Sequence, residues 1–440
     1  MQRAIVLAGG GAKGAYQIGF WKALRELGID YQIVTGSSVG ALNAALMAQG
    51  NYDEALLMWS SVKTEDIVER TPSLLSQSSL SDGIAASLKG IMGDLAEDVV
   101  KVKMDPVPLG HLIERYLQEN LLRESGVALG IMTTEYPSMK AAPFSLEEIP
   151  RGMVDEYLLA SSTVFPSMEP KTIGAKRYVD GGYSDNFPVN LALDLGAKEI
   201  IGVGLRASGV EAKYQTDYPV RIIRPSFDLG PSMIFDPEQT ARNMTLGYND
   251  TMRSFGIYDG GSYTFLHGEA KALADEKNAY FSEILYRTGV VSVSERKEFY
   301  KSLAVKAFAE ATKQRFGRMK EELALLSAEA AALIFAVDPL PVYDRTAFAE
   351  AVLAKANPVR EENAGKVQAV LDGSKTLASR LNQLRELDSK DIVSYLSDAF
   401  EKKADKKEME REYRALVRLA PKEFFAALYL ASLKKQGENG

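Results

Sequence analysis

The first fifty residues alternate twice between a short apolar run and a helical pattern, and both junctions are rich in glycine. The first run covers residues 4–8 and leads into a helical pattern that closes at Gly28. The second covers residues 31–35 and leads into an alanine-rich helix that ends near Gly50. Short apolar runs are typical of strands buried on both faces, and this order of elements indicates parallel pairing. The sequence therefore predicts an α/β fold with a parallel sheet.

The rest of the chain divides into two parts that differ in composition and in predicted secondary structure. Strand-like runs at residues 126–134, 177–179, 200–205 and 220–223, with helical patterns at 153–162 and after Asp236, continue the α/β character. Residues 294–337 and 388–435 are rich in Ala, Leu, Glu, Lys and Arg and carry little strand signal. We expect one domain over residues 1–275, including an interrupted, mostly helical segment at 51–123 with a loop at 76–82, and a helical region over residues 276–440.

Composition excludes several kinds of chemistry. The 440 residues include no cysteine, so disulfides, thiolate catalysis and Cys-type zinc sites are impossible. The only histidines are His111 and His267, which argues against a multi-histidine metal site, and we expect neither metal nor cofactor. A net charge of −7 argues against nucleic acid as the main partner.

Neither of the most apolar segments has the length of a membrane-spanning element. The run at the N-terminus is too short for the core of a signal peptide. Residues 323–337 are apolar but contain Glu329, and a membrane span needs about 20 apolar residues, so we expect a buried helix there. We predict a soluble, cytoplasmic protein of unknown oligomeric state whose membrane contact is peripheral.

The second junction matches the pattern Gly-Xaa-Ser-Xaa-Gly over residues 36–40. A nucleophilic serine must be held on a tight turn between a strand and a helix, and the flanking positions then need small residues such as Gly36 and Gly40. The pattern alone is weak, because a small-residue turn in any α/β unit also produces it. Its place after an expected strand and before an expected helix makes Ser38 a candidate nucleophile.

The first junction, residues 9–14, reads Gly-Gly-Gly-Ala-Lys-Gly and allows three interpretations. A dinucleotide loop would need an acidic residue at the end of the second strand, whereas Asp30 precedes that strand. A purely structural turn is the second interpretation. The third is an oxyanion hole, in which the amides at Gly9, Gly10, Gly11, Lys13 and Gly14 face a developing alkoxide. The carboxyl ends of adjacent parallel strands would bring this loop to Ser38.

A serine needs a base, and the sequence leaves more than one candidate. A triad of Ser38, Asp180 and His267 has a possible chain order, but no motif around His267 would aim its side chain. In a Ser–Asp dyad, partial desolvation would raise the pKa of the carboxylate toward that of a useful base. Asp180 and Asp259 each precede two glycines, Gly181 and Gly182 in the first case, and an Asp-Gly pair is also a common hairpin turn.

Taken together, these motifs resemble those of the patatin-like phospholipases. Four pieces match in order and spacing over roughly residues 1–270: the 9–14 loop, the 36–40 elbow, residues 160–162 with 165–166, and residues 180–182 with Asn186 and Pro188. The resemblance implies a three-layer α/β/α core, Ser38 as nucleophile, Asp180 as base, the glycine loop as oxyanion hole, and hydrolysis of fatty acyl esters without metal. Lys13 stands where many relatives carry arginine, so bidentate phosphate binding there is in doubt.

Three further expectations follow. Residues 51–123 could contain a lid over an acyl pocket, and a lipid hydrolase must meet its substrate at a membrane or micelle. The aromatic segment at 423–435 could be an interfacial helix, but we favour its packing against other helices. The alternatives to a lipid hydrolase are a nucleotide-binding module built on residues 9–14, or an interaction scaffold that works through its helical region.

Overall fold

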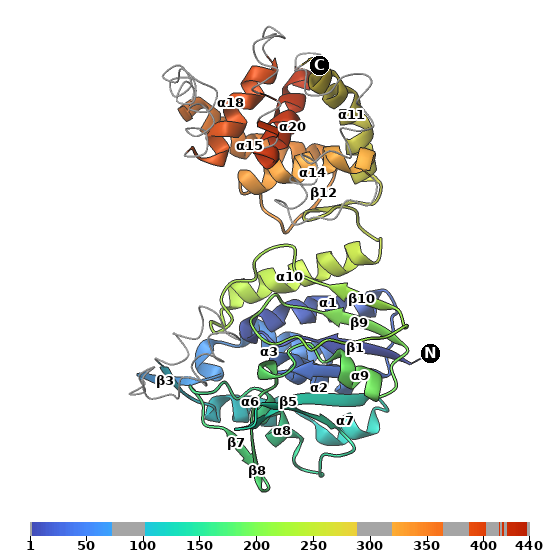
Figure 1. Ribbon diagram of the computed structural model, residues 1–440, viewed down its shortest axis with the longest axis vertical. Coiled ribbons are helices and arrows are strands. Elements are labelled where there is room, and N and C mark those ends of the chain that lie inside the picture. The colour runs from blue at the N-terminus through green and yellow to red at the C-terminus, as the bar shows by residue number, and fades with distance from the viewer. Residues whose placement is uncertain are drawn as a thin grey trace. The chain divides into compact units, whose positions relative to one another are not determined.

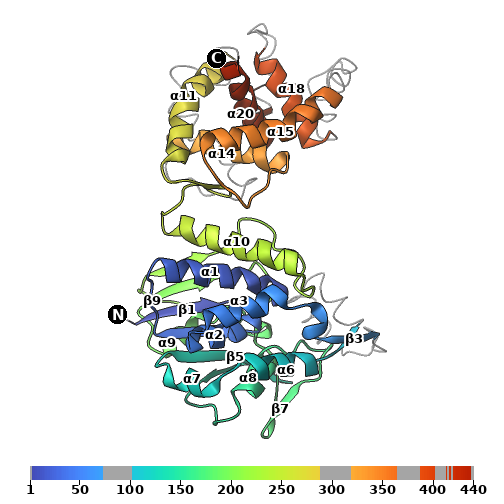
Figure 2. The same ribbon diagram turned by 180° about the vertical axis from the view of Figure 1, so that it is seen from behind.

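The computed structural model describes residues 2–72, 102–287, 319–363, 387–401, 413, 416–417 and 420–437. Contacts divide the chain into two units, Met1–Ser254 and Phe255–Gly440. The first unit contains the large sheet and the second most of the C-terminal helices (Figures 1 and 2). The two units divide after Ser254, which lies N-terminal to the boundary at residue 275 that composition predicts. Helix α11 (Glu269–Arg287) runs through that position unbroken and packs against helices of the second unit.

An eight-stranded mixed sheet organises the first unit, in the order β10-β9-β1-β2-β5-β8-β7 with β6 paired to β5. Its strands are β1 (Arg3–Leu7), β2 (Ile33–Ser37), β5 (Ala128–Tyr136), β6 (Lys140–Ser145), β7 (Lys171–Ile173), β8 (Lys176–Asp180), β9 (Glu199–Val203) and β10 (Val220–Ile223). The five strands from β10 to β5 are parallel, which confirms the expected parallel sheet. Strands β6, β7 and β8 add an antiparallel edge that the sequence pattern had not distinguished.

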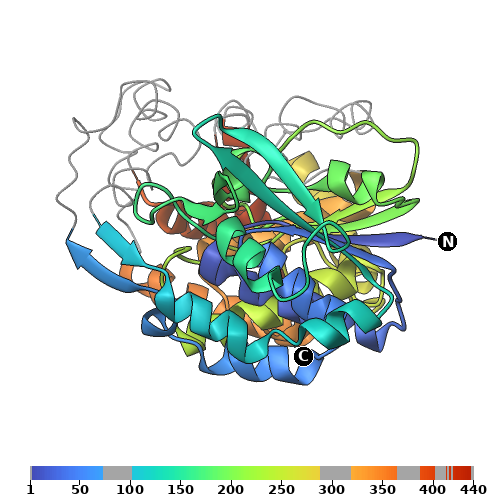
Figure 3. The same ribbon diagram turned by 90° about the horizontal axis from the view of Figure 1, so that it is seen from below.

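Helices cover both faces of this sheet (Figure 3). Helices α1 (Ala15–Glu26), α2 (Val39–Gln49), α3 (Tyr52–Ser61) and α10 (Pro237–Ser254) pack among themselves on one face, and α8 (Val154–Ser161) joins them beside β5. Helix α9 (Val189–Asp194) packs on β1, β2, β5 and β9 from the other face. The three-layer α/β/α core expected from the resemblance is therefore confirmed. Strands β1 and β2 are almost fully buried between the two layers, as their apolar runs predict.

The segment between α2 and β5 contains short elements. Helix α3 is followed by η2 (Thr64–Asp66) and an antiparallel pair of strands, β3 (Glu69–Pro72) and β4 (Val102–Asp105). Helices α6 (Val107–Tyr116) and α7 (Glu119–Glu124) complete it. Residues 73–101, which include the expected loop at 76–82, lie outside the described residues.

The second unit is mainly helical. It contains β11 (Thr264–Phe265) and β12 (Val342–Tyr343) with helices α11, α14 (Met319–Ile334), α15 (Arg345–Asn363), α18 (Ser389–Glu401) and α20 (Pro421–Gly437). Helix α14 is buried where described, as its apolar sequence predicts. In α20, Phe424, Phe425 and Leu428 are fully buried, so this helix packs against its neighbours and the interfacial interpretation is wrong for that aromatic face. None of the helices in the described ranges has both the length and the apolar character that crossing a membrane requires.

Candidate active site

The elbow at residues 36–40 lies where β2 ends and α2 begins. Ser38 occupies the turn with φ 53° and ψ −130°, a conformation that costs a non-glycine residue energy and must be imposed by its surroundings. A Cβ atom at Gly40 would lie 2.3 Å from the Leu7 carbonyl oxygen, and one at Gly36 would lie 2.2 Å from the Gly40 carbonyl oxygen. The two glycines therefore allow strand and helix to approach closely enough to hold the half-buried Ser38 on the turn.

Strands β2 and β8 bring residues 38 and 180 together, because both pair with β5. The register places Ser37 opposite Met132 and Asp180 opposite Thr133, the next residue along β5. The parallel β2 and the antiparallel β8 therefore end next to each other on one edge of β5. A Cβ atom at Gly181 would lie 2.3 Å from the Met132 carbonyl oxygen, so this meeting of strand ends requires glycine after Asp180.

The Ser38 hydroxyl lies close enough to the Asp180 carboxylate to stabilise its charged form. The backbone N–H of Gly182 donates to Asp180 Oδ1 at 2.7 Å. Burial raises the pKa of Asp180 to about 6, although both of these interactions act in the opposite direction by favouring the charged form. The carboxylate is therefore ionised at neutral pH and is a much better proton acceptor than an exposed aspartate.

Residues 161 and 163 hold this pair in place. The hydroxyl of Ser161 accepts a hydrogen bond from the Ser38 N–H at 2.9 Å and donates to the Met132 carbonyl at 2.7 Å. The carbonyl of Thr163 accepts from the Asp180 N–H at 2.8 Å. One short segment at the end of α8 thus supports both residues. The sequence indicates Ser161 only through the resemblance, because nothing in its local pattern predicts this contact.

The glycine loop presents two amides to the same site. The N–H groups of Gly10 and Gly11 donate no hydrogen bond within the described part of the chain, and both residues line the cavity that contains Ser38. The other residues of the loop have different contacts. The Gly9 N–H donates to the Asn186 carbonyl at 3.2 Å, and the Lys13 N–H donates to the Gly10 carbonyl. Of the five amides expected to act as donors, those of Gly9 and Lys13 are therefore already bonded, whereas those of Gly10 and Gly11 are available at the cavity.

A buried polar network fixes both ends of this loop. Gln17 Nε2 donates to the Ala8 carbonyl at 2.7 Å, just before the loop. Asn43 Nδ2 donates to the Gly14 carbonyl at 3.1 Å and to Gln17 Oε1 at 2.7 Å, while Trp59 Nε1 donates to Asn43 Oδ1 at 2.9 Å. Gly14 itself packs against Trp59. No local sequence pattern indicates this network, whose members come from three different helices.

Asn186 ties the loop to the segment after β8. Its backbone carbonyl accepts from the Gly9 N–H, and its side-chain Nδ2 donates to the Gly9 carbonyl at 3.3 Å. The neighbouring Asp185 carboxylate accepts from the N–H groups of Phe187 and Ala212, which orders the chain on either side. Hydrogen bonds between Gly9 and Asn186 therefore join the loop after β1 directly to the segment after Asp180, beside Ser38.

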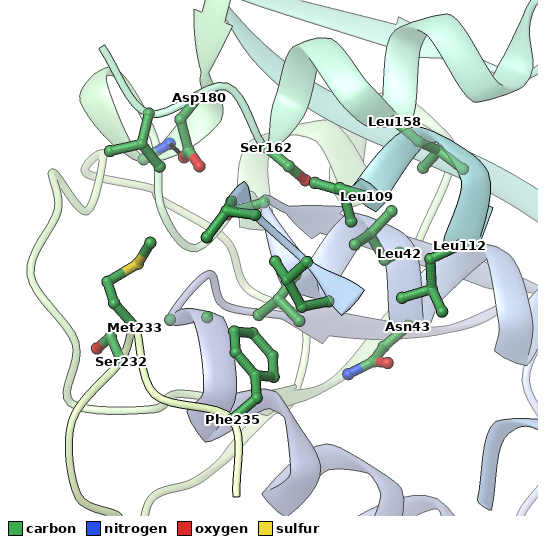
Figure 4. A pocket seen from close by; sticks show the side chains of 18 of the residues that line it. Leu42, Asn43, Leu109, Leu112, Leu158, Ser162, Asp180, Ser232, Met233 and Phe235 are labelled. Atoms are coloured by element: carbon green, nitrogen blue, oxygen red, sulfur yellow. Dashed lines mark hydrogen bonds between the residues drawn. The ribbon is translucent and has the colours of Figure 1, made fainter. Parts of the chain in front are cut away.

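A cavity of about 560 Å³ opens from this polar group of residues into an apolar region (Figure 4). Its polar end includes Ser38, Asp180, Gly10 and Gly11. We call the apolar region the acyl arm, lined by leucine and isoleucine side chains of α2, α6 and α8: Leu42, Leu46, Leu109, Leu112, Ile113 and Leu158. Helix α6 forms part of the wall of this region, and the lid expected within residues 51–123 stays a prediction. The volume lies in the usual range for small-molecule sites.

The other candidate bases are the two histidines and Asp259. Both histidines are in the described ranges, and neither lines the cavity. His111 is exposed on α6, and the His267 side chain is 78% exposed in the second unit, 3.5 Å from Asp259. The Asp259 carboxylate accepts a hydrogen bond from the Gly268 N–H. Among the residues that line the cavity, Asp180 is therefore the carboxylate beside Ser38.

Comparison with known proteins identifies the sheet-containing part of the chain. A family model described as patatin-like phospholipase matches residues 5–193. The chain is 28% identical over 207 residues to "Lysophospholipase NTE1" of Mycosarcoma maydis, covering 46% of this chain and 10% of that protein. It is 27% identical over 206 residues to "Patatin-like phospholipase domain-containing protein 6" of Homo sapiens, covering 46% and 13%. An uncharacterized NTE family protein of Mycobacterium tuberculosis is 28% identical over 205 residues, covering 47% and 49%.

The chain therefore spans half or less of the length of these relatives. Among solved structures, VipD from Legionella pneumophila aligns with a TM-score of 0.39 and 14% identity, covering 98% of this chain and 91% of that one. The match to the family model includes the glycine loop, the elbow and the Asp180 turn. Residues 5–193 of the chain therefore match a patatin-like phospholipase domain.

Proposed function

We propose that this chain is a serine esterase that hydrolyses fatty acyl esters of lipids, with Ser38 as nucleophile and Asp180 as base. The observation that carries the proposal is that the Ser38 hydroxyl and the desolvated Asp180 carboxylate lie beside each other at the polar end of a largely apolar cavity. A hydroxyl beside a desolvated carboxylate can lose its proton as it attacks a carbonyl carbon. The adjacent acyl arm suits a fatty chain.

Each proton transfer in the proposed cycle passes through Asp180. Ser38 Oγ attacks the ester carbonyl carbon while Asp180 takes its proton, and the N–H groups of Gly10 and Gly11 hydrogen-bond to the resulting oxyanion. The bond to the leaving alkoxide then breaks, and Asp180 returns the proton to that oxygen. Water next attacks the acyl-Ser38 ester with Asp180 as base. The fatty acid leaves as Ser38 Oγ recovers its proton.

The substrate class that we favour is phospholipids or lysophospholipids. The names of the curated relatives support this choice, since they include a lysophospholipase and patatin-like phospholipases. The acyl arm can accommodate an apolar chain, but its lining does not indicate which head group the substrate carries. A lipid at a membrane surface or in a micelle is therefore the proposed partner, and the chemistry needs no cofactor.

Covalent labelling tests the proposed nucleophile. We expect a fluorophosphonate probe to label the wild-type protein at Ser38, because the reagent needs an activated hydroxyl beside oxyanion donors. Peptide mass spectrometry after digestion identifies the site. Ser37→Ala is a matched control, since Ser37 is the neighbouring buried serine and does not line the cavity. Labelling at another residue, or saturable nucleotide binding without labelling, would contradict the proposal.

The proposed base predicts a specific pH dependence. Asp180 must be ionised to accept a proton, and its pKa is about 6. We therefore expect kcat/KM to rise about tenfold per pH unit below 6 and to level off above about pH 7. The measurement is hydrolysis of a soluble short-chain p-nitrophenyl ester from pH 4 to 9. A histidine base would give a similar profile, so His267→Ala and His111→Ala should be measured too and should keep it. Loss of the profile in either variant would favour a triad.

A further inference from the structure

The hydroxyl of Ser162 is a buried polar group that the proposed cycle does not use. Ser162 is 7% exposed, and its Oγ has no hydrogen-bond partner among the residues that the structure describes. It lines the same cavity as Ser38 and Asp180. Figure 4 shows its side chain pointing into that cavity, in the space between Asp180 and Leu158. Of the four buried side-chain atoms without a partner in the described ranges, this one alone belongs to a cavity-lining residue.

Its neighbours in the chain place Ser162 at the reacting end of the cavity. Ser161 accepts a hydrogen bond from the Ser38 N–H, and Thr163 accepts one from the Asp180 N–H. Consecutive Cα atoms are only about 3.8 Å apart. Ser162 therefore lies between the residue that supports the nucleophile and the residue that supports the base.

The opposite side of Ser162 faces the acyl arm. Leu158 lies four residues earlier, and residues four apart share one face of a helix, so Leu158 and Ser162 form successive parts of the same wall. Helix α6 packs against α8 and adds Leu109 and Leu112 to this region. An acyl chain that leaves the carbonyl at Ser38 and enters the acyl arm would pass Ser162 within its first few carbons.

A plain hydrocarbon chain and an oxygen-bearing chain would meet this hydroxyl differently. Methylene groups would cover Ser162 Oγ and leave it without water or a partner, which is unfavourable for a buried polar group. A hydroxyl on the chain could donate to or accept from Oγ. Sites built to hydrogen-bond a substrate hydroxyl discriminate strongly against analogues that lack it.

We propose that Ser162 makes the acyl arm selective for acyl chains that carry a hydroxyl group close to the ester carbonyl, as in 3-hydroxyacyl esters. This specificity rests on the proposed ester hydrolysis at Ser38. Ser162 contributes to this specificity by contacting the acyl chain of the substrate, and it takes no part in proton transfer.

The test compares 3-hydroxydecanoyl and decanoyl esters of 4-methylumbelliferone in the full-length wild-type protein and in Ser162→Ala. We expect the wild type to prefer the hydroxylated ester by about tenfold in kcat/KM and Ser162→Ala to lose this preference. The ratio of the two substrates within one preparation is independent of the fraction of folded protein. A variant that folds poorly therefore still gives a valid result.

Leu158→Ala is the matched control, because it alters the same wall without removing a hydroxyl. It should change the hydrolysis of both esters together and keep the ratio. A wild-type ratio near one, a ratio unchanged in Ser162→Ala, or an equal loss on both esters would overturn the specificity. Failure to cleave either ester, with Ser38 unlabelled by the fluorophosphonate, would instead overturn the proposed function.

Discussion

Replacing Ser38 by alanine is expected to lower kcat/KM for ester hydrolysis by about 10⁴-fold or more. The variant has no hydroxyl to form the acyl-enzyme, and loss of a serine nucleophile typically removes most of an esterase's rate enhancement. The measurement is the release of free fatty acid from phospholipid vesicles, followed by lipid-product analysis of both proteins. Ser38→Ala should keep the fold, because alanine fits the space and the backbone N–H of residue 38 can still donate to Ser161 Oγ.

The matched control is again Ser37→Ala, at the adjacent position. The Ser37 hydroxyl is buried without a partner among the described residues and lies outside the cavity lining, so its removal should leave activity within a few-fold of the wild type. Full activity of Ser38→Ala would refute the assignment of the nucleophile. Equal inactivation of both variants would show that the elbow tolerates no change and would remove the support for a specific role of Ser38.

Asp180→Asn is expected to reduce activity by about 10³–10⁴-fold and, at the same time, to stabilise the protein. Asparagine retains the shape of the side chain but cannot take a proton. Burial of the wild-type carboxylate raises its pKa from 3.8 to about 6, so its ionised form opposes folding. At 1.36 kcal/mol per pKa unit, we expect the variant to gain about 2–3 kcal/mol in free energy of unfolding at pH 8.

The pH window of this gain follows from the direction of the pKa shift. Because the folded state binds the Asp180 proton more tightly than the unfolded state, the wild type loses stability as the pH rises from about 4 to 6. The advantage of Asp180→Asn should therefore be absent below pH 4 and complete above about pH 7. Urea unfolding followed by tryptophan fluorescence measures it, since both tryptophans, Trp21 and Trp59, lie in the first unit. A variant less stable than the wild type at pH 8 would contradict this account.

Local sequence patterns predicted much of the central sheet. The residues expected in the strand at 220–223 are those of β10, and the runs at 4–8 and 31–35 lie within two residues of β1 and β2. Apolar runs bounded by glycines carry this signal because both faces of such strands are buried. The antiparallel edge of β6, β7 and β8 was not distinguished, because β6 and β7 carry no run of buried residues and because β8 pairs with β5 across a long stretch of the chain.

The candidate site could be predicted only in part. Glycine spacing and the family resemblance indicated Ser38, Asp180 and the loop at residues 9–14. They could not indicate which amides of that loop remain available, since this depends on the Asn186 carbonyl, nor the support that Ser161 gives. The buried network of Gln17, Asn43 and Trp59 was also missed. Each of these is a contact between segments with no local sequence signature.

Strands β2 and β8 end next to each other on one edge of β5, so enzymatic activity depends on the local stability of this edge. The hydroxyl follows β2 and the carboxylate ends β8, and these strands do not pair with each other but with the neighbouring residues Met132 and Thr133 of β5. Detachment of β8 from β5 would separate them while the parallel strands stay intact. Loss of activity should therefore report local opening at this edge of the sheet. It can occur before the protein unfolds globally.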